Sequence, residues 1–300
     1  MKFSVIIPSY NRGPLIVNTI NSVLNQTYKN FEIIIVDNCS TDNTIEVLQP
    51  ILQKHENIHL IRNEQNFERS ISRNIGFKAA KGDFLTLLDS DDFMYPNNLL
   101  DASNFIKPNP EIKIFHNLYE LIDSDKKLIR KYSYPSLKNY KLKILKGNFF
   151  SCIGVFLSKE IYQNYFFDEN KIIVGSEDWE LWIRILADFK PGRINRVNNG
   201  ILHHDSRSID KFTIDSAIER VEYIGEKIKK DKNLQENYGN FINQFYASGY
   251  LFAASSANSA KMFKLAFKLS VKAFKFDWKC IFEGKFIRIL QISIFRIKNK

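Results

Sequence analysis

The run Phe31–Val36 is apolar almost throughout, rich in β-branched residues, and followed directly by a carboxylate, Asp37. A strand with one face in water alternates apolar and polar residues, whereas this run offers neither face to water. Such a strand is typical of the interior of a parallel sheet that helices cover on both sides. The segment therefore predicts an α/β fold.

The neighbouring segments alternate between strand and helix patterns. Residues 4–7, 58–61 and 84–88 predict further strands, whereas residues 15–24 and 70–80 predict helices. Strands and helices that alternate at this interval indicate a doubly wound, mostly parallel sheet. Ligands bind outside the carboxyl ends of the strands in such sheets, and three polar groups follow those ends here. They are Pro8-Ser9-Tyr10, Asp37-Asn38 and Asp89-Ser90-Asp91.

The last of these groups places three carboxylates, Asp89, Asp91 and Asp92, directly after an apolar strand. If the extended backbone continues through them, Asp89 and Asp91 project from one side of the strand. Two adjacent carboxylates repel each other, whereas Mg²⁺ or Mn²⁺ would neutralise them and keep positions free for phosphate oxygens. We therefore expect a metal–diphosphate site; the alternative is a solvated acidic turn.

Several motifs resemble, in order and spacing, the opening of the family 2 glycosyltransferases. They are Ser4–Arg12, Ser22–Tyr28, Phe31–Asp42, Arg73-Asn74-x-Gly76, Ala80-x-Gly82-Asp83 and Asp89-x-Asp91-Asp92. The resemblance covers residues 3–110. It implies a GT-A fold, a nucleotide-sugar donor, a divalent metal (Mn²⁺ or Mg²⁺) and usually inversion at the anomeric carbon.

The resemblance also implies roles for single residues. Asp91 matches the direct metal ligand, and Asp89 matches an acid near the ribose and the metal. Tyr10 would stack on the nucleobase, or else pack on the sheet edge. Arg73 matches an arginine near the donor; the alternative is an ion pair on a helix face.

Base recognition is expected at the second strand end. Many family members carry two aspartates where this chain has Asp37 and Asn38, and the second pairs with uracil. The Asn38 amide can accept from a ring N–H and donate to a carbonyl, so a UDP-sugar donor stays favoured. Pro8, Ser9 and Ser90 complete the expected nucleotide site.

A second cluster, Gly175–Arg184, resembles the Glu-Asp motif that opens a helix in this family. Acids in a first helical turn are also favoured by the helix dipole alone. The resemblance assigns the general base that deprotonates the sugar acceptor to Asp178, with Glu177 as the second choice. Trp182 would be an acceptor platform or simply part of the core.

The segment Leu202–Ser208 contains two adjacent histidines, at the place where the family often has a histidine that completes the metal or diphosphate site. Spacing does not decide between His203 and His204, and His203 is slightly preferred.

Cysteine content and charge indicate the cellular compartment and a basic C-terminal region. Three widely separated cysteines suggest reduced thiols, and neither a secretory signal nor a membrane-spanning run is expected. Residues 261–300 hold eleven Lys and Arg against two acids, which is +9 of the total +10. We therefore expect a cytoplasmic protein with a basic tail.

The tail has a helical pattern. At about 100° per residue, its lysines fall within an arc of roughly 80°, and apolar residues cover most of the rest. The lysines are Lys261, Lys264, Lys268, Lys272, Lys275 and Lys279. This basic amphipathic helix would lie on an anionic membrane surface, or pack as a hairpin against residues 235–257. Nucleic-acid binding is not expected.

These observations predict a GT-A domain over residues 1–208 and a helical, basic region over residues 209–300. The function expected is sugar transfer from a nucleotide-sugar, favouring a UDP-sugar, to a glycan or lipid-linked acceptor at the inner face of the cell membrane. The alternatives are a nucleotidyltransferase, a haloacid-dehalogenase-like phosphatase and a non-catalytic membrane-binding protein.

Overall fold

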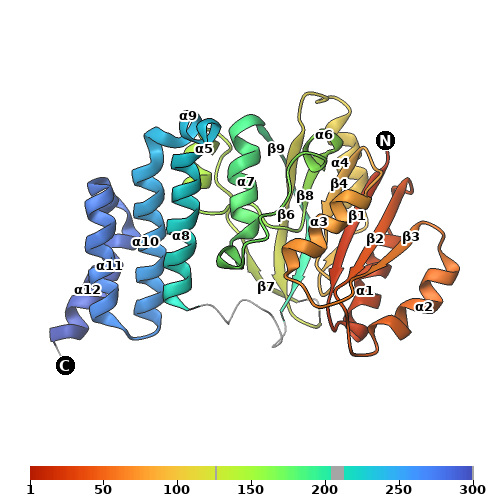
Figure 1. Ribbon diagram of the computed structural model, residues 1–300, viewed down its shortest axis with the longest axis horizontal. Coiled ribbons are helices and arrows are strands. Elements are labelled where there is room, and N and C mark those ends of the chain that lie inside the picture. Colours follow the sequence, from red (N-terminus) through yellow and green to blue (C-terminus); the bar gives the residue numbers. More distant parts are fainter. Residues whose placement is uncertain (126, 204–212, 299–300) are drawn as a thin grey trace. The chain divides into compact units, whose positions relative to one another are not determined.

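The computed structural model describes residues 1–125, 127–203 and 213–298. The chain divides into two compact units (Figure 1). The first comprises Met1–Leu137, Phe150–Glu169 and Asp188–Arg207, and the second comprises Lys138–Phe149, Asn170–Ala187 and Ser208–Lys300. Each unit is therefore built from three separate segments of the chain. Each unit is described by itself.

A mixed sheet forms the centre of the first unit. Within the described residues it has nine strands, of which eight lie in the order β3-β2-β1-β4-β8-β6-β9-β5, while β7 pairs with β6. The strands are β1 (Phe3–Ser9), β2 (Phe31–Asp37), β3 (Ile58–Arg62), β4 (Phe84–Leu87), β5 (Phe93–Met94), β6 (Ile114–Ile122), β7 (Leu128–Lys131), β8 (Val155–Ser158) and β9 (Pro191–Leu202). Strands β3, β2, β1 and β4 are parallel, and β8 joins β4 in the antiparallel direction. The parallel half of the sheet is the one that the sequence predicts.

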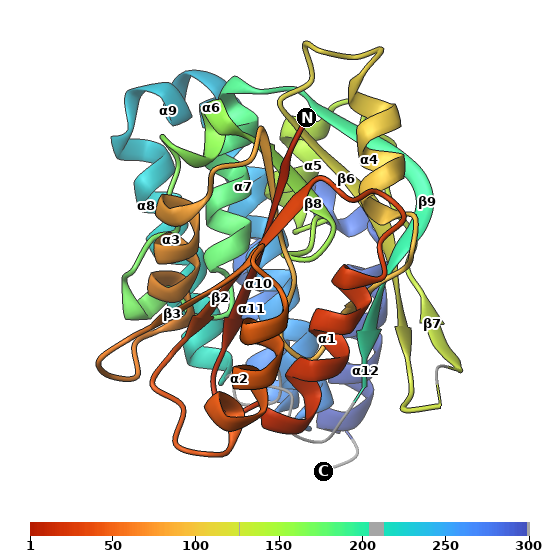
Figure 2. The same cartoon turned by 90° about the vertical axis from the view of Figure 1, so that its right-hand side faces the viewer.

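Helices cover both faces of this parallel half (Figure 2). The helices of the unit are α1 (Gly13–Leu24), α2 (Thr44–Lys54), α3 (Arg69–Ala79), α4 (Asn98–Ile106) and α6 (Lys159–Tyr162). Alternate residues of β1 (Phe3, Val5 and Ile7) share one core with apolar residues of α1 and α2. Helix α3 packs on the other face. The doubly wound α/β fold is therefore confirmed.

The contact of α3 with β1 depends on a glycine. A Cβ on Gly76 would lie 2.2 Å from the Ile6 Cγ2 atom, closer than atoms in contact approach each other. Ile6 is fully buried and cannot easily move aside. The glycine thus sets how closely the helix that carries Arg73 approaches the sheet.

The second unit is helical. It contains α5 (Tyr140–Lys146), α7 (Glu177–Asp188), α8 (Ile214–Lys230), α9 (Lys232–Tyr238), α10 (Ile242–Ser259), α11 (Phe263–Phe276) and α12 (Gly284–Lys298), with short 3₁₀ turns at Lys171–Ile173, Gly239–Phe241 and Trp278–Phe282. Helix α10 packs against α8 and α11, and α12 packs against α11. The small residues Ala253 and Ala254 are fully buried, as the hairpin interpretation predicts. Among the described helices, none has the length and apolar character that a bilayer span requires.

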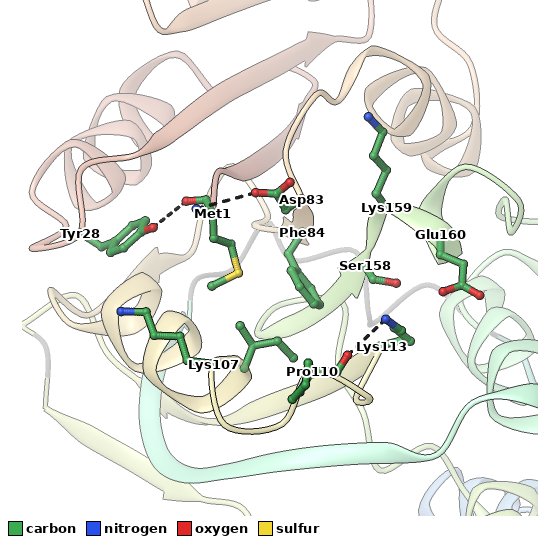
Figure 3. Close-up of a pocket in the computed structure, with 11 residues that line it drawn as sticks. Met1, Tyr28, Asp83, Phe84, Lys107, Pro110, Lys113, Ser158, Lys159 and Glu160 are labelled. Carbon is green, nitrogen blue, oxygen red and sulfur yellow. Dashed lines mark hydrogen bonds and ion pairs between the residues drawn. The ribbon is translucent and has the colours of Figure 1, made fainter.

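A cavity of about 570 Å³ opens at the amino ends of the strands, where Met1, Phe84, Pro110 and Ser158 contribute to its wall (Figure 3). The Lys113 ammonium donates to the Pro110 carbonyl at 3.2 Å. This cavity lies at the opposite edge of the sheet from the polar groups that the sequence singles out.

Candidate active site

Strand register brings the predicted polar groups to one edge of the sheet. Ser9, the last residue of β1, is paired with Asp37, the last residue of β2. On the other side of β1, Leu87 at the end of β4 is paired with Ile6. Because these strands are parallel, the residues that follow them emerge side by side.

The acidic motif forms a turn, so the condition of an extended backbone through the three acids is not met. Strand β4 ends at Leu87, and the Asp92 N–H donates to the Asp89 carbonyl at 3.0 Å, which closes a turn over Ser90 and Asp91. Asp89 accepts from Arg73 at 3.2 Å, and Asp91 accepts from Arg12 at 3.2 Å. Backbone hydrogen bonding within the turn therefore directs each carboxylate to a different arginine.

Asp92 anchors this turn to the rest of the unit. Its side chain accepts from the Leu202 N–H at 3.0 Å, and its carbonyl accepts from the Thr19 hydroxyl at 2.8 Å. Because Leu202 ends β9, the bond also places the backbone of His203 beside the acidic turn. The His203 side chain is exposed.

The predicted metal ligands do not form a ready-made cluster. In the part of the chain that the structure describes, no group of three His, Cys, Asp or Glu side chains is arranged to hold a metal ion. Asp89 and Asp91 lie in one turn, and His203 follows the strand that Asp92 binds. His204 lies outside the described residues.

Arg73 is held rigidly. Its side chain is 3% exposed, and its guanidinium lies 5.3 Å from the centre of the Phe167 ring. Its neighbour Asn74 fixes Phe167 through both backbone groups, since it accepts from the Phe167 N–H at 2.8 Å and donates to the carbonyl at 2.9 Å. Arg73 therefore presents a cation to Asp89 from a buried, preorganised position.

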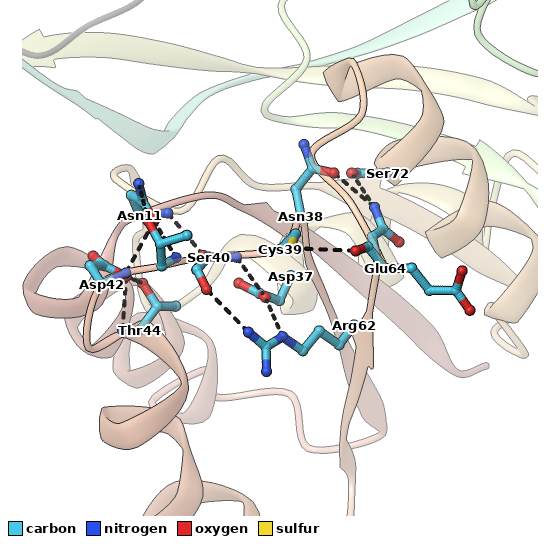
Figure 4. A network of polar contacts seen from close by, with 12 residues as sticks. Asn11, Asp37, Asn38, Cys39, Ser40, Asp42, Thr44, Arg62, Glu64 and Ser72 are labelled. Carbon is cyan, nitrogen blue, oxygen red and sulfur yellow. Dashed lines mark hydrogen bonds and ion pairs between the residues drawn. The ribbon is translucent and has the colours of Figure 1, made fainter.

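Two buried polar atoms at the strand ends, on Asp37 and Ser9, have no hydrogen-bond partner in the part of the chain that the structure describes. One carboxylate oxygen of Asp37 accepts from the Ser40 N–H at 3.0 Å and lies 3.5 Å from the Arg62 guanidinium (Figure 4). The other oxygen, Oδ1, has no hydrogen-bond partner among the described residues, and neither has the Ser9 hydroxyl. Buried polar atoms normally meet a partner, so this pair indicates where a ligand or water binds.

Asn38 is fully engaged with the loop that follows β3. Its carbonyl oxygen accepts from Asn63 at 2.9 Å and from the Phe67 N–H at 3.0 Å. Its amide nitrogen donates to the Asn66 side chain at 2.7 Å and to the Phe67 carbonyl at 2.6 Å. A carboxamide has two donors and two acceptor positions, so in this arrangement Asn38 holds the loop and has no capacity left for a base. Tyr10, by contrast, is 40% exposed.

Sequence reasoning missed the loop that carries Arg12. Asn11 adopts a left-handed φ of 51°, its N–H donates to Ser40 at 2.9 Å, and its side chain accepts from the Thr41 N–H at 2.9 Å. The Arg12 N–H donates to the Thr44 hydroxyl at 2.9 Å. These bonds tie the end of β1 to the loop after β2. Arg12 stands within the first quoted motif, but it is 79 residues from Asp91, so no local signal in the sequence marks this contact.

The Glu-Asp motif begins α7 in the second unit. Asp178 is half-buried and accepts from the Asn148 amide at 3.0 Å. Glu177 is buried and accepts from the Gly175 N–H at 2.5 Å, while Glu180 forms ion pairs with Arg184 and Lys227. Asp178 is thus more accessible than Glu177.

Trp182, on the same helix, is fully buried. An acceptor platform must be exposed to a sugar, so this structure corresponds to the alternative interpretation, a core residue.

Comparison with known proteins agrees with this fold. The model of glycosyl transferase family 2 matches residues 4–166. A UDP-Glc:alpha-D-GlcNAc-diphosphoundecaprenol beta-1,3-glucosyltransferase, WfaP of Escherichia coli, is 33% identical over 70% of this chain and 80% of its own length.

Two solved structures share the fold. S. aureus TarS 1–349 in complex with UDP-GlcNAc has a TM-score of 0.68 at 19% identity, over 99% of this chain and 81% of TarS. The mannosyltransferase PcManGT of Pyrobaculum calidifontis, in complex with GDP-Man and Mn²⁺, has a TM-score of 0.59 at 14% identity, over 98% of this chain and 84% of PcManGT. The predicted GT-A fold is confirmed.

Proposed function

Because the chain belongs to glycosyltransferase family 2, we propose that it transfers a sugar from a UDP-sugar to a lipid-linked glycan acceptor with inversion, using Mn²⁺ or Mg²⁺. The family match establishes the transferase class, and it disfavours the nucleotidyltransferase, phosphatase and non-catalytic alternatives. The lipid-linked acceptor is proposed by analogy with WfaP, whose name specifies a diphosphoundecaprenol-linked acceptor.

The observation that carries the donor proposal is the polar edge of the sheet. Asp37 Oδ1 and the Ser9 hydroxyl, which lack a partner among the described residues, lie at adjacent strand ends, next to the exposed ring of Tyr10. Asp37 Oδ1 is an acceptor for a base or ribose hydroxyl, and a tyrosine ring can stack on a base. Pro8 and Ser90 complete this edge at the ends of β1 and β4.

The acidic turn suits a divalent cation. Asp91 and Asp89 offer carboxylate oxygens, the ligands that Mg²⁺ and Mn²⁺ prefer, and His203 follows the strand that Asp92 holds. A metal bound there would neutralise the departing diphosphate. Arg73, which is already paired with Asp89, would orient the donor from its buried position.

We assign the general base to Asp178. Its carboxylate is only half-buried, and its hydrogen bond from Asn148 sets its orientation. A base must come within hydrogen-bond reach of the acceptor hydroxyl, which an accessible carboxylate can do. Glu177 stays the second choice, because it is buried and bound to Gly175.

Calorimetry with UDP, GDP and dTDP, with and without Mn²⁺, tests the donor site. We expect Mn²⁺-dependent binding of UDP to the wild type and its loss in Asp91→Ala. Asp101→Asn is the matched control, because Asp101 pairs with the exposed Arg196 at 2.8 Å outside the acidic turn. If no nucleoside diphosphate binds with Mn²⁺ present, the proposed donor site is wrong.

We also propose peripheral attachment to the cytoplasmic face of the membrane through the basic C-terminal helices. Phe267, Val271 and Phe274 are exposed along one side of α11, at the spacing i, i+4, i+7. Lys264 and Lys268 lie beside this stripe and are also exposed. Trp278 and Phe282, which follow the helix, are among the most exposed aromatic residues of the described chain.

An apolar stripe bordered by lysines fits an anionic bilayer surface, where rings enter the interface and ammonium groups meet phosphates. In cosedimentation with phosphatidylglycerol vesicles, the wild type should bind and the Phe267→Ser/Phe274→Ser variant should bind much more weakly. Ile129→Ser, which removes an exposed apolar side chain from β7, is the control. Equal binding of both variants, or self-association in place of vesicle binding, would contradict this attachment.

A further inference from the structure

We propose that Arg12 is the counter-ion of Asp91 in the metal-free enzyme and moves to the donor diphosphate when metal and nucleotide bind. The inference rests on the proposed function and adds a positioning residue for the diphosphate. Its starting point is the contact between the Arg12 Nε and the Asp91 Oδ2 atoms, 3.2 Å apart.

This ion pair is not an ordinary surface pair. The side chains of Arg12 and Asp91 are 21% and 16% exposed, so water screens their attraction less than it does for exposed charges. The carboxylate that Arg12 binds is the proposed direct metal ligand. A metal ion that binds Asp91 must therefore displace the guanidinium or share the carboxylate with it.

The backbones on both sides of the pair are fixed. The Arg12 N–H donates to Thr44, and Asn11 is bound to Ser40 and Thr41. On the other side, the Asp92 contact with Leu202 holds the acidic turn in place. Exchange of partners thus requires rotation of the Arg12 side chain and no movement of the loops.

The donor supplies a new partner for the released arginine. A diphosphate beside Asp91 carries negative charge, and a guanidinium binds phosphate oxygens through two parallel N–H donors. When metal binds alone, the Arg12–Asp91 ion pair is broken and Arg12 gains no new partner. When metal binds with the nucleotide, the diphosphate becomes the new partner of Arg12. The chain should therefore bind metal weakly alone and tightly with the nucleotide.

The Arg12→Gln variant separates this role from a structural one, because it should move two affinities in opposite directions. Removal of the competitor should strengthen Mn²⁺ binding to the nucleotide-free protein by about tenfold, and loss of the diphosphate contact should weaken UDP binding with Mn²⁺ by about tenfold. Free Mn²⁺ is measured by electron paramagnetic resonance and UDP binding by calorimetry. Arg12→Lys keeps the charge but not the forked donors, so intermediate values are expected.

Arg196→Gln is the matched control, since it removes an exposed arginine from its ion pair with Asp101, outside the acidic turn, and should change neither affinity. If Arg12→Gln lowers both affinities or changes neither, the inference is overturned, and unchanged thermal unfolding of the variant rules out loss of the fold. If wild-type protein binds no UDP with Mn²⁺, the proposed function fails, which is distinct from a failure at Arg12.

Discussion

At the scale of single residues, Asp37 and Asn38 are neighbours in the chain with opposite hydrogen-bonding states. Asp37 has a buried oxygen without a partner among the described residues, whereas Asn38 uses every donor and acceptor of its amide on the loop at residues 63–67. An atom already satisfied by the protein gains little from a ligand. Asp37 is therefore the better candidate for direct donor contact, and Asn38 for shaping the loop.

The variant Asn38→Asp tests this division. A carboxylate cannot donate to the Asn66 oxygen or the Phe67 carbonyl, so two hydrogen bonds become repulsive contacts. We expect a loss of about 2 kcal/mol in the free energy of unfolding and weaker UDP binding. Urea unfolding and calorimetry measure both, and tighter UDP binding would instead mean that residue 38 contacts the base.

His116 gives a pH prediction. Burial lowers its pKa to about 3, despite the opposing contact with the Asn117 carbonyl. In the unfolded chain, His116 takes up a proton near pH 6.5, whereas in the folded protein it stays neutral until about pH 3. The free energy of unfolding therefore falls as the pH drops from about 6.5 towards 3. In nuclear magnetic resonance spectra, the His116 ring signals should not shift between pH 8 and about 4.5. A midpoint near 6 would contradict the prediction.

At the scale of secondary-structure elements, the parallel strands are joined by a buried carboxylate as well as by apolar packing. Glu32 on β2 accepts from Lys2 at 2.5 Å, from the Ser4 hydroxyl of β1 at 2.6 Å and from the Lys81 N–H at 2.7 Å. Burial raises its pKa, but these hydrogen bonds outweigh burial and leave the pKa lowered. The charged form is thus part of the sheet's structure.

Replacing Glu32 by Gln should lower the free energy of unfolding by about 2 kcal/mol at pH 7. The loss is no larger because Lys2 is partly exposed, so water can solvate its ammonium group. The pKa of Glu32 is lower in the folded protein than in the unfolded chain. Its carboxylate therefore stabilises the fold fully at pH values above the unfolded pKa, and this stabilisation is lost as the pH falls through the folded pKa. The difference between wild type and variant should therefore shrink on acidification. Urea unfolding at a series of pH values checks this, and a constant difference would argue against it.

The packing of α3 on β1 gives a second prediction at this scale. Gly76→Ala places a methyl group 2.2 Å from Ile6, so the helix must move away from the sheet. We expect a loss of about 1–3 kcal/mol in stability. Because Arg73 lies on the same helix, UDP binding should weaken as well. Gly239→Ala is the control, since the nearest atom to its new methyl group would lie at 3.5 Å.

At the scale of the whole molecule, charge is distributed very unevenly. The last forty residues carry +9 of the formal charge of +10, so the remaining chain is close to neutral. The exposed apolar stripe of α11 lies in this basic region. Attraction to an anionic surface would therefore act on one end of the chain and combine charge with apolar burial.

This combination predicts a partial dependence on salt. Raising NaCl from about 0.1 M to 1 M shortens the screening length from about 10 Å to 3 Å and should reduce vesicle binding severalfold. Apolar insertion is not screened, so some binding should persist in the wild type. In the Phe267→Ser/Phe274→Ser variant, high salt should abolish the vesicle binding that remains at low salt. Complete insensitivity to salt would exclude the lysines from binding.

The sequence by itself determined the parallel strands of the sheet and the polar chemistry at their carboxyl ends. The strand Phe31–Asp37 and the helix containing Arg73 were predictable because hydrophobic periodicity and strand-end polarity are local properties. The motif order was likewise sufficient for the family and the GT-A fold.

The tertiary structure alone decided which groups meet. Arg12 and Asp91 are 79 residues apart, and the turn that separates Asp89 from Asp91 overrides strand alternation. The saturation of Asn38 and the burial of Trp182 likewise depend on distant segments. A side chain's partners are set by packing and hydrogen bonds between remote residues, which local sequence patterns do not encode.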